Sequence, residues 1–98
     1  MIVLISPLVR VNKKSYDMKT ITPAQIRAAR ALLKWSAHEL ARASLVGVAT
    51  VRRAEGHESS VQTTEANLQA MKIALEKAGI AFIEDNGGGA GVRFRKRK

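Results

Sequence analysis

Two adjacent arginines, Arg52 and Arg53, are the side chains of this sequence best suited to chemistry with a polar or anionic partner. A guanidinium presents its N–H donors in a planar fork, which matches the oxygens of a phosphate or the O6 and N7 atoms of guanine. Both residues follow Val51, so if that side chain points into a core, the two arginines point to solvent. The chemistry expected of this pair is recognition rather than bond making.

Other residues that are capable of catalysis or metal binding lack suitable partners. His38 and His57 lie nineteen positions apart in a chain without cysteine, so no metal site is expected. Ser36 and Ser44 have no His and Asp partners arranged for nucleophilic catalysis, so an enzyme is not expected. The glycine-rich segment 87–91 is followed by neither a helix nor a Lys-Ser/Thr pair, and a turn is the simpler interpretation. We therefore expect no cofactor.

The charge of the chain indicates a polyanionic partner, and the distribution of the charge matters more than its size. The formal net charge is +9 over 98 residues. Residues 1–20 contribute +3, residues 21–90 only +1, and residues 91–98 contribute +5. The basic excess therefore lies in two flanks that can contact a phosphate backbone. A solubilising tail is the alternative explanation.

Residues 1–20 are expected to form a flexible basic leader. Its apolar run over 1–5 ends at Ser6 and Pro7, which makes it too short to span a membrane, and no signal-peptide cleavage site follows. Met18 is an equally good candidate for the natural start. Since the chain has no cysteine, disulfides are excluded, and we expect a cytoplasmic protein without membrane contact.

A helix is expected over about 23–35, at the start of the middle region. Thr22 has the character of an N-cap, Pro23 occupies the first helical position, and Gln25 completes a capping box. Trp35 is expected to end this helix. As the only tryptophan, it is better explained as a large core residue than as a stacking platform for a nucleobase.

Two short helices are expected to follow. Ser36 and Glu39 form a second capping box, which predicts a helix over about 36–43. The residues 45–47 interrupt the helical pattern, and a third helix is expected over 48–55. Two short helices joined by three or four residues form a helix-turn-helix.

The last part of the chain combines a helix with alternating residues. A fourth helix is expected after Thr64 and before Gly79. The apolar segment 80–83 and the alternating segment 92–95 flank the glycine-rich segment 85–91, which predicts a terminal β-hairpin. The core is expected to contain apolar residues at helical spacing: Ile26, Leu33, Leu40, Val51, Leu68, Met71 and Leu75.

These elements predict a mainly α fold with a C-terminal β-hairpin. Residues 1–20 would be the leader, residues 21–79 a bundle of four main helices that contains the helix-turn-helix, and residues 80–98 the hairpin and a basic tail. The expected fold therefore presents the two arginines on the second helix of the helix-turn-helix.

The helix-turn-helix region resembles the lambda-repressor and Cro-like (Xre) family. The residues that carry the resemblance are the stretch 35–42, Val46, the stretch 49–52 and Glu55. The likeness extends over about residues 22–79. It implies a lambda-repressor-like bundle and a transcriptional regulator that reads specific double-stranded DNA with the recognition helix 48–55 in the major groove.

The resemblance also implies roles for individual positions. Arg30 and Glu55 are expected to form a structural ion pair. Since one such helix reads only a few base pairs, a homodimer is expected, with the free edge of the hairpin as its contact. The expected base-facing residues are Val48, Ala49 and Arg53. The expected contacts to the DNA backbone are Ala37, His38, Gly47, Thr50 and Arg52.

A second function stays open, namely an antitoxin-like or other protein-interaction module in which DNA binding is secondary. Members of the family usually have Gln where Ala37 stands and Gly where Leu45 stands, and both departures favour this alternative. A third alternative, RNA binding by the basic tails, lacks the aromatic platforms expected for single-strand recognition.

Overall fold

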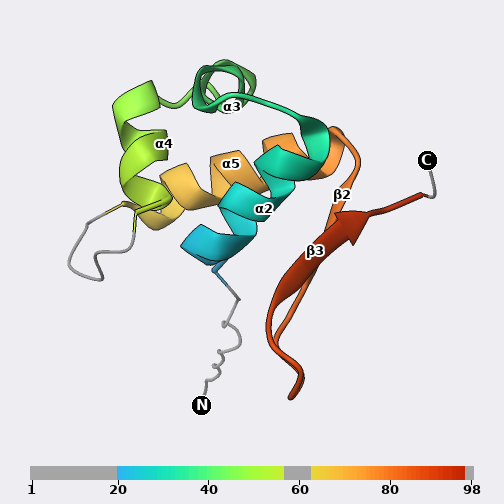
Figure 1. Cartoon of the computed structure of the whole chain (residues 1–98). Coiled ribbons are helices and arrows are strands. Elements are labelled where there is room, and N and C mark those ends of the chain that lie inside the picture. The colour runs from blue at the N-terminus through green and yellow to red at the C-terminus, as the bar shows by residue number, and fades with distance from the viewer. Residues whose placement is uncertain (1–19, 57–62, 97–98) are drawn as a thin grey trace, which may run out of the picture.

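Figure 1 shows the computed structural model of the chain, which describes residues 20–56 and 63–96. This part of the chain is mainly helical, with four helices followed by a two-stranded antiparallel sheet, as the sequence predicted. The leader predicted over 1–20 lies outside the described residues, apart from Thr20. The elements are α2 (Pro23–Leu33), α3 (Ala37–Ser44), α4 (Val48–Ala54), α5 (Glu65–Lys77), β2 (Ile80–Ile83) and β3 (Gly91–Phe94).

Two reciprocal capping boxes begin α2 and α3 where the sequence predicted helices. The Thr22 hydroxyl accepts a hydrogen bond from the Gln25 amide, and the Gln25 side chain accepts one from the Thr22 amide. Ser36 and Glu39 make the same exchange at the start of α3. These bonds satisfy amides that have no acceptor within the helix, so the starts of both helices are encoded locally.

Left-handed residues end both of these helices. Lys34 has φ 59° and Leu45 has φ 60°. Residues other than glycine adopt this left-handed backbone conformation at a cost of about 1 to 2 kcal/mol. Because Lys34 leaves the helical region, α2 ends at Leu33 and not at Trp35, which corrects the predicted end. The backbone N–H of Trp35 then donates to the carbonyl of Arg30, which closes the last turn.

One apolar core holds the helices and the sheet together. Five of its predicted members are fully buried, and the hairpin adds Ile80, which is also fully buried. Leu33 and Leu68 pack against the core but are only partly buried, because one is the last residue of α2 and the other lies in the first turn of α5. The five fully buried predicted residues are Ile26, Leu40, Val51, Met71 and Leu75.

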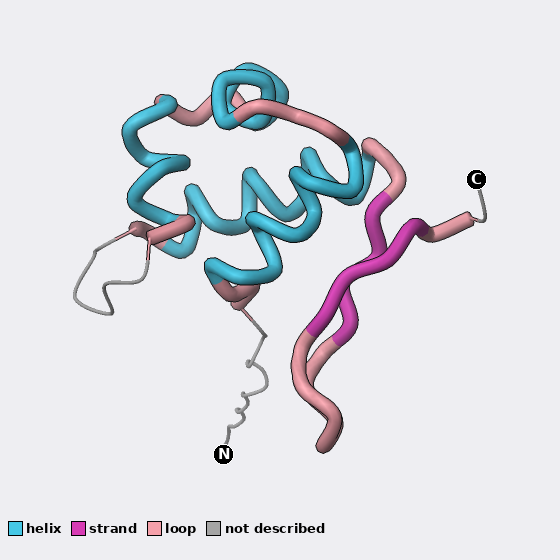
Figure 2. The backbone as a smooth tube through the Cα atoms, in the orientation of Figure 1, coloured by secondary structure: helices cyan, strands magenta, loops and turns pink. Residues whose placement is uncertain are grey.

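The hairpin lies alongside α2 and α5, as the backbone trace in Figure 2 shows. Its register pairs Ile80 with Phe94 and Phe82 with Val92, and β3 contacts α2 while β2 contacts α5. The Gln25 side chain of α2 donates hydrogen bonds to the carbonyls of Ile83 and Gly91 at 3.2 and 2.9 Å. Within residues 20–56 and 63–96, no helix has the length and apolar character needed to cross a membrane.

Candidate nucleic-acid interface

The helices α3 and α4 pack against each other and form one end of the molecule (Figure 1). A three-residue turn, 45–47, joins them, and within it the Val46 amide donates to the Ala41 carbonyl at 3.1 Å. On the inner side, α4 buries Val51 and Ala54 in the core. The opposite side of α4 therefore faces solvent.

The exposed side of α4 carries the arginine pair. Ala49, Arg52 and Arg53 are exposed, whereas Thr50 and Val48 are half-buried. Val48 packs partly against the core, so only part of its apolar surface is available to a partner. The structure thus brings the predicted base-facing residues Ala49 and Arg53 to the same exposed helix and leaves Val48 at its margin.

The start of α3 presents backbone donors beside the arginine-bearing helix. The first-turn amides of Ala37 and His38 have no acceptor within the helix, and His38 is exposed while Ala37 is half-buried. The capping box places the carboxylate of Glu39 in this turn, and its charge weakens the attraction of the helix start for a phosphate. Gly47, the N-cap of α4, is exposed and supplies no side chain to cap that helix.

A bidentate ion pair anchors the end of α4 to α2. Arg30 Nε donates to Glu55 Oε2 at 2.5 Å, and Arg30 Nη2 donates to Glu55 Oε1 at 2.8 Å, which confirms the predicted pair. The third nitrogen of this guanidinium donates to the Trp35 carbonyl at 2.8 Å. The bond with Glu55 raises the pKa of Arg30 above its ordinary value, although partial burial opposes the shift.

Arg27 adds a second tie between the same two helices, which the sequence prediction missed. Its guanidinium donates to the backbone carbonyl of Glu55. Arg27 precedes Arg30 by one helical turn, so the two arginines lie on neighbouring positions of α2. This spacing was the only signal in the sequence, and it does not distinguish a structural arginine from a solvated one.

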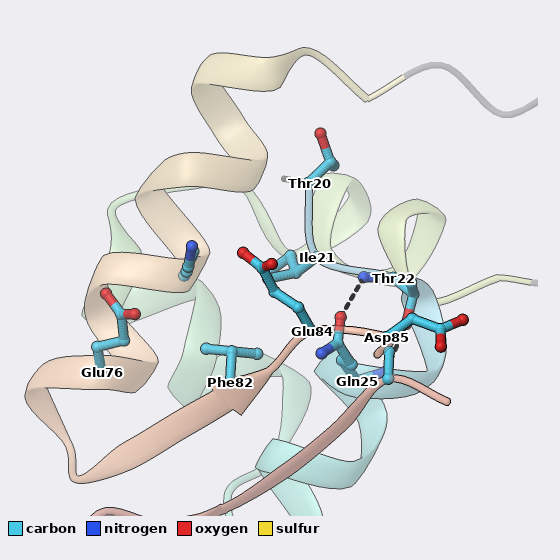
Figure 3. Close-up of a pocket in the computed structure, with 10 residues that line it drawn as sticks. Thr20, Ile21, Thr22, Gln25, Glu76, Phe82, Glu84 and Asp85 are labelled. Atoms are coloured by element: carbon cyan, nitrogen blue, oxygen red, sulfur yellow. Dashed lines mark hydrogen bonds between the residues drawn. The ribbon is translucent and has the colours of Figure 1, made fainter. Parts of the chain in front are cut away.

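A groove lies between the start of α2, α5 and the hairpin (Figure 3). Its volume is about 220 Å³, and a second hollow of about 310 Å³ shares Thr20, Ile21 and Lys72 with it. Sequence reasoning missed the groove because its residues come from distant segments. The residues named in the close-up are Thr20, Ile21, Thr22, Gln25, Glu76, Phe82, Glu84 and Asp85.

The groove is acidic at its rim and has apolar residues among its lining. Glu76, Glu84 and Asp85 contribute carboxylates, with Lys72 as the opposing charge. Hydrogen bonds from the amides of Gly87 and Gly89 hold the pKa of the Asp85 carboxyl below its ordinary value. In the described ranges no group of three or more His, Cys, Asp or Glu residues is arranged to hold a metal ion.

Two comparisons with known proteins give no match. No protein-family model matches the chain, and no curated protein matches it significantly. The candidate functional surfaces of the described residues are the exposed side of α4, the start of α3 and the acidic groove.

Proposed function

We propose that this protein is a sequence-specific double-stranded DNA-binding transcriptional regulator with a lambda-repressor-like helix-turn-helix, in which α3 is the first helix and α4 the recognition helix. The observation that carries the proposal is the two-sided character of α4. It buries Val51 and Ala54, and it exposes Arg52 and Arg53. The major groove of B-DNA is about 12 Å wide and admits one α-helix, so an exposed basic helix side can reach base edges there.

The proposed DNA contacts are of two kinds, those to bases and those to phosphates. Arg53 bridges guanine O6 and N7, while Val48 and Ala49 offer apolar contact to a thymine methyl. The remaining residues of this surface position the protein on the phosphates rather than reading bases. These are Ala37, His38, Gly47, Thr50 and Arg52.

The ties between α2 and α4 support this function because a reading helix must be held in a fixed orientation. Glu55 directly follows α4 and is bound through its carboxylate by Arg30 and through its carbonyl by Arg27. A rigid α4 pays less conformational entropy when it enters a groove.

We expect two copies to act together on DNA. A single recognition helix reads only a few base pairs, and a pair of copies on half-sites one helical turn apart extends the sequence that is read. The hairpin β2–β3 is the proposed contact, since the edges of a two-stranded sheet can pair with a second copy. Light scattering at micromolar concentration tests this, and a monomer that binds a palindromic site one to one would contradict it.

Selection of bound sites from random duplex DNA tests the function itself. We expect enrichment of a short motif that contains guanine, and binding to that motif that persists in excess competitor DNA. Titration of salt on the selected and a scrambled duplex separates base reading from charge alone. Equal affinity for both duplexes would reject sequence-specific binding.

A protein-interaction module is the second candidate. Leu45 at the α3–α4 turn is 93% exposed and is therefore accessible to a partner, and the carboxylates of the acidic groove are complementary in charge to a basic segment. If the selection yields no motif, variants of Leu45 and Glu84 in a partner-binding assay become the deciding measurement.

A further inference from the structure

The two adjacent arginines of α4 differ in the residue that lies one helical turn before each of them. Arg53 follows Thr50 by three positions, and its Nη2 donates to the Thr50 hydroxyl at 3.0 Å. Arg52 follows Ala49 by three positions, and the methyl side chain of Ala49 offers no acceptor. Among residues 20–56 and 63–96, the Arg52 side chain makes no hydrogen bond. The same helix therefore presents one tethered and one untethered guanidinium.

The hydrogen bond to Thr50 leaves enough donors on the Arg53 guanidinium to bind a base. A guanidinium has five N–H donors, and a bidentate contact to guanine uses two of them. One bond to Thr50 therefore does not compete with base recognition. Thr50 is itself half-buried and β-branched, which limits the rotamers of its hydroxyl. The hydroxyl is thus a stiff support for a long side chain.

A tethered arginine is better suited to reading a base than an untethered one. A base edge must be met at one position and in one orientation, whereas a phosphate accepts a charge over a wider range of geometries. Part of the rotamer entropy that Arg53 would lose on binding is already lost in the free protein. Arg52 keeps its freedom and is suited to the phosphates.

We infer that Thr50 is a positioning residue that orients Arg53 for base reading, and that Arg52 contacts only the DNA backbone. This inference depends on the proposed function and refines it. Thr50 then supports the base-reading arginine instead of contacting the DNA backbone. Of the two neighbouring arginines, only Arg53 carries the sequence information.

A double-mutant cycle on the selected DNA site tests the inference. Thr50→Val keeps the β-branched shape but removes the acceptor, and we expect it to weaken binding about three- to tenfold. In an Arg53→Ala background the same change has no further effect, because there is no guanidinium left to orient. Thr50→Ser keeps the acceptor but lacks the β-branch, and we expect it to bind more tightly than Thr50→Val. Circular dichroism melting confirms that each variant is folded.

Arg52→Ala is the matched control within the same helix. Combined with Thr50→Val, it is additive, and it weakens the selected and the scrambled duplex equally. If Thr50→Val costs the same in the presence and absence of Arg53, Thr50 contacts the DNA itself and the inference is overturned. If the wild type shows no motif at all, the proposed function fails, and this is evident before any variant is measured.

The free protein supplies a readout that needs no DNA. We expect the Nε–H order parameter of Arg53 from NMR relaxation to exceed that of Arg52, and to fall to the Arg52 value in Thr50→Val. Equal order parameters in the wild type would overturn the inference even if a DNA motif is found.

Discussion

The carboxylate of Glu55 receives two hydrogen bonds from the guanidinium of Arg30, which lies 25 positions earlier in the chain. The side chains of the pair are 23% and 10% exposed, so the pair is shielded from water on most sides. Bidentate geometry of this kind is stronger than a single surface contact. It connects the last turn of α2 with the end of α4.

Arg30→Gln is expected to lower the free energy of unfolding by about 2 to 4 kcal/mol. This cost is higher than for exposed pairs because Glu55 loses both guanidinium donors. It is lower than for fully buried pairs because both side chains keep some exposure to water. Urea unfolding measures the change. The control is Arg42→Gln on the exposed side of α3, which should change the free energy by less than about 0.5 kcal/mol. Equal effects of the two variants would contradict the structural role of the pair.

Gln25→Leu is expected to loosen the hairpin selectively. The substitution removes the donor to Ile83 and Gly91 and also half of the capping box, with an expected loss of about 1 to 3 kcal/mol. Hydrogen exchange of the β2 and β3 amides should accelerate more than that of α3. Gln69→Leu, at an exposed position of α5, serves as control and should leave the hairpin amides unchanged.

Leu45→Gly is expected to stabilise the protein by about 0.5 to 1 kcal/mol. Glycine adopts the left-handed conformation without the Cβ penalty, and part of the gain is offset by its greater freedom in the unfolded chain. Leu45→Ala retains the penalty and should give no such gain. The denaturation midpoints of both variants check this. A destabilised Leu45→Gly protein would show that the leucine side chain makes a stabilising contact.

The loop after β2 is expected to respond to acid. The pKa of Asp85 is lower in the folded protein than in the unfolded chain, so its carboxylate stabilises the folded loop at pH values above the ordinary pKa of about 3.9. This stabilisation is lost as the pH falls through the lower pKa of the folded protein. NMR titration should show the Asp85 carboxyl and the Gly87 and Gly89 amides moving together. In Asp85→Asn these amide shifts should no longer depend on pH in this range.

Arg53→Ala and removal of residues 95–98 are expected to affect DNA binding differently. The first should reduce affinity for the selected site by about 1 to 3 kcal/mol and relax the choice of base, with little effect on a scrambled duplex. The second should weaken both duplexes alike and flatten the salt dependence, because phosphate contacts release counterions without reading bases. An equal loss of Arg53→Ala on both duplexes would make Arg53 a phosphate contact.

Much of the fold was predictable because its signals are local. A capping residue and its partner three positions later share one turn, so the Thr22 and Ser36 caps follow from the sequence alone. The end of α2 was predicted two residues late because Lys34 is not a residue typical of the left-handed conformation. The Arg30–Glu55 pair came from the family resemblance and not from any rule of spacing.

The parts of the candidate site that could not be predicted depend on contacts between distant segments. Nothing near Gln25 in the sequence indicates that its side chain reaches Ile83 and Gly91. The acidic groove likewise exists only when α5 and the hairpin meet. The hydrogen bond between Thr50 and Arg53 spans a single turn, so helical spacing allows it, but a hydroxyl three positions before an arginine is too common to indicate it.

The bonds from Gln25 to the hairpin also affect how the chain folds as it is synthesised. Gln25 and Gly91 are 66 positions apart, and the fully buried Ile80 fills a core whose other members lie between residues 21 and 75. The four helices emerge from the ribosome with one side of that core still open to water. Closure of this side must wait until the hairpin has been translated and has left the ribosome, and until then the apolar surface stays exposed and prone to aggregation.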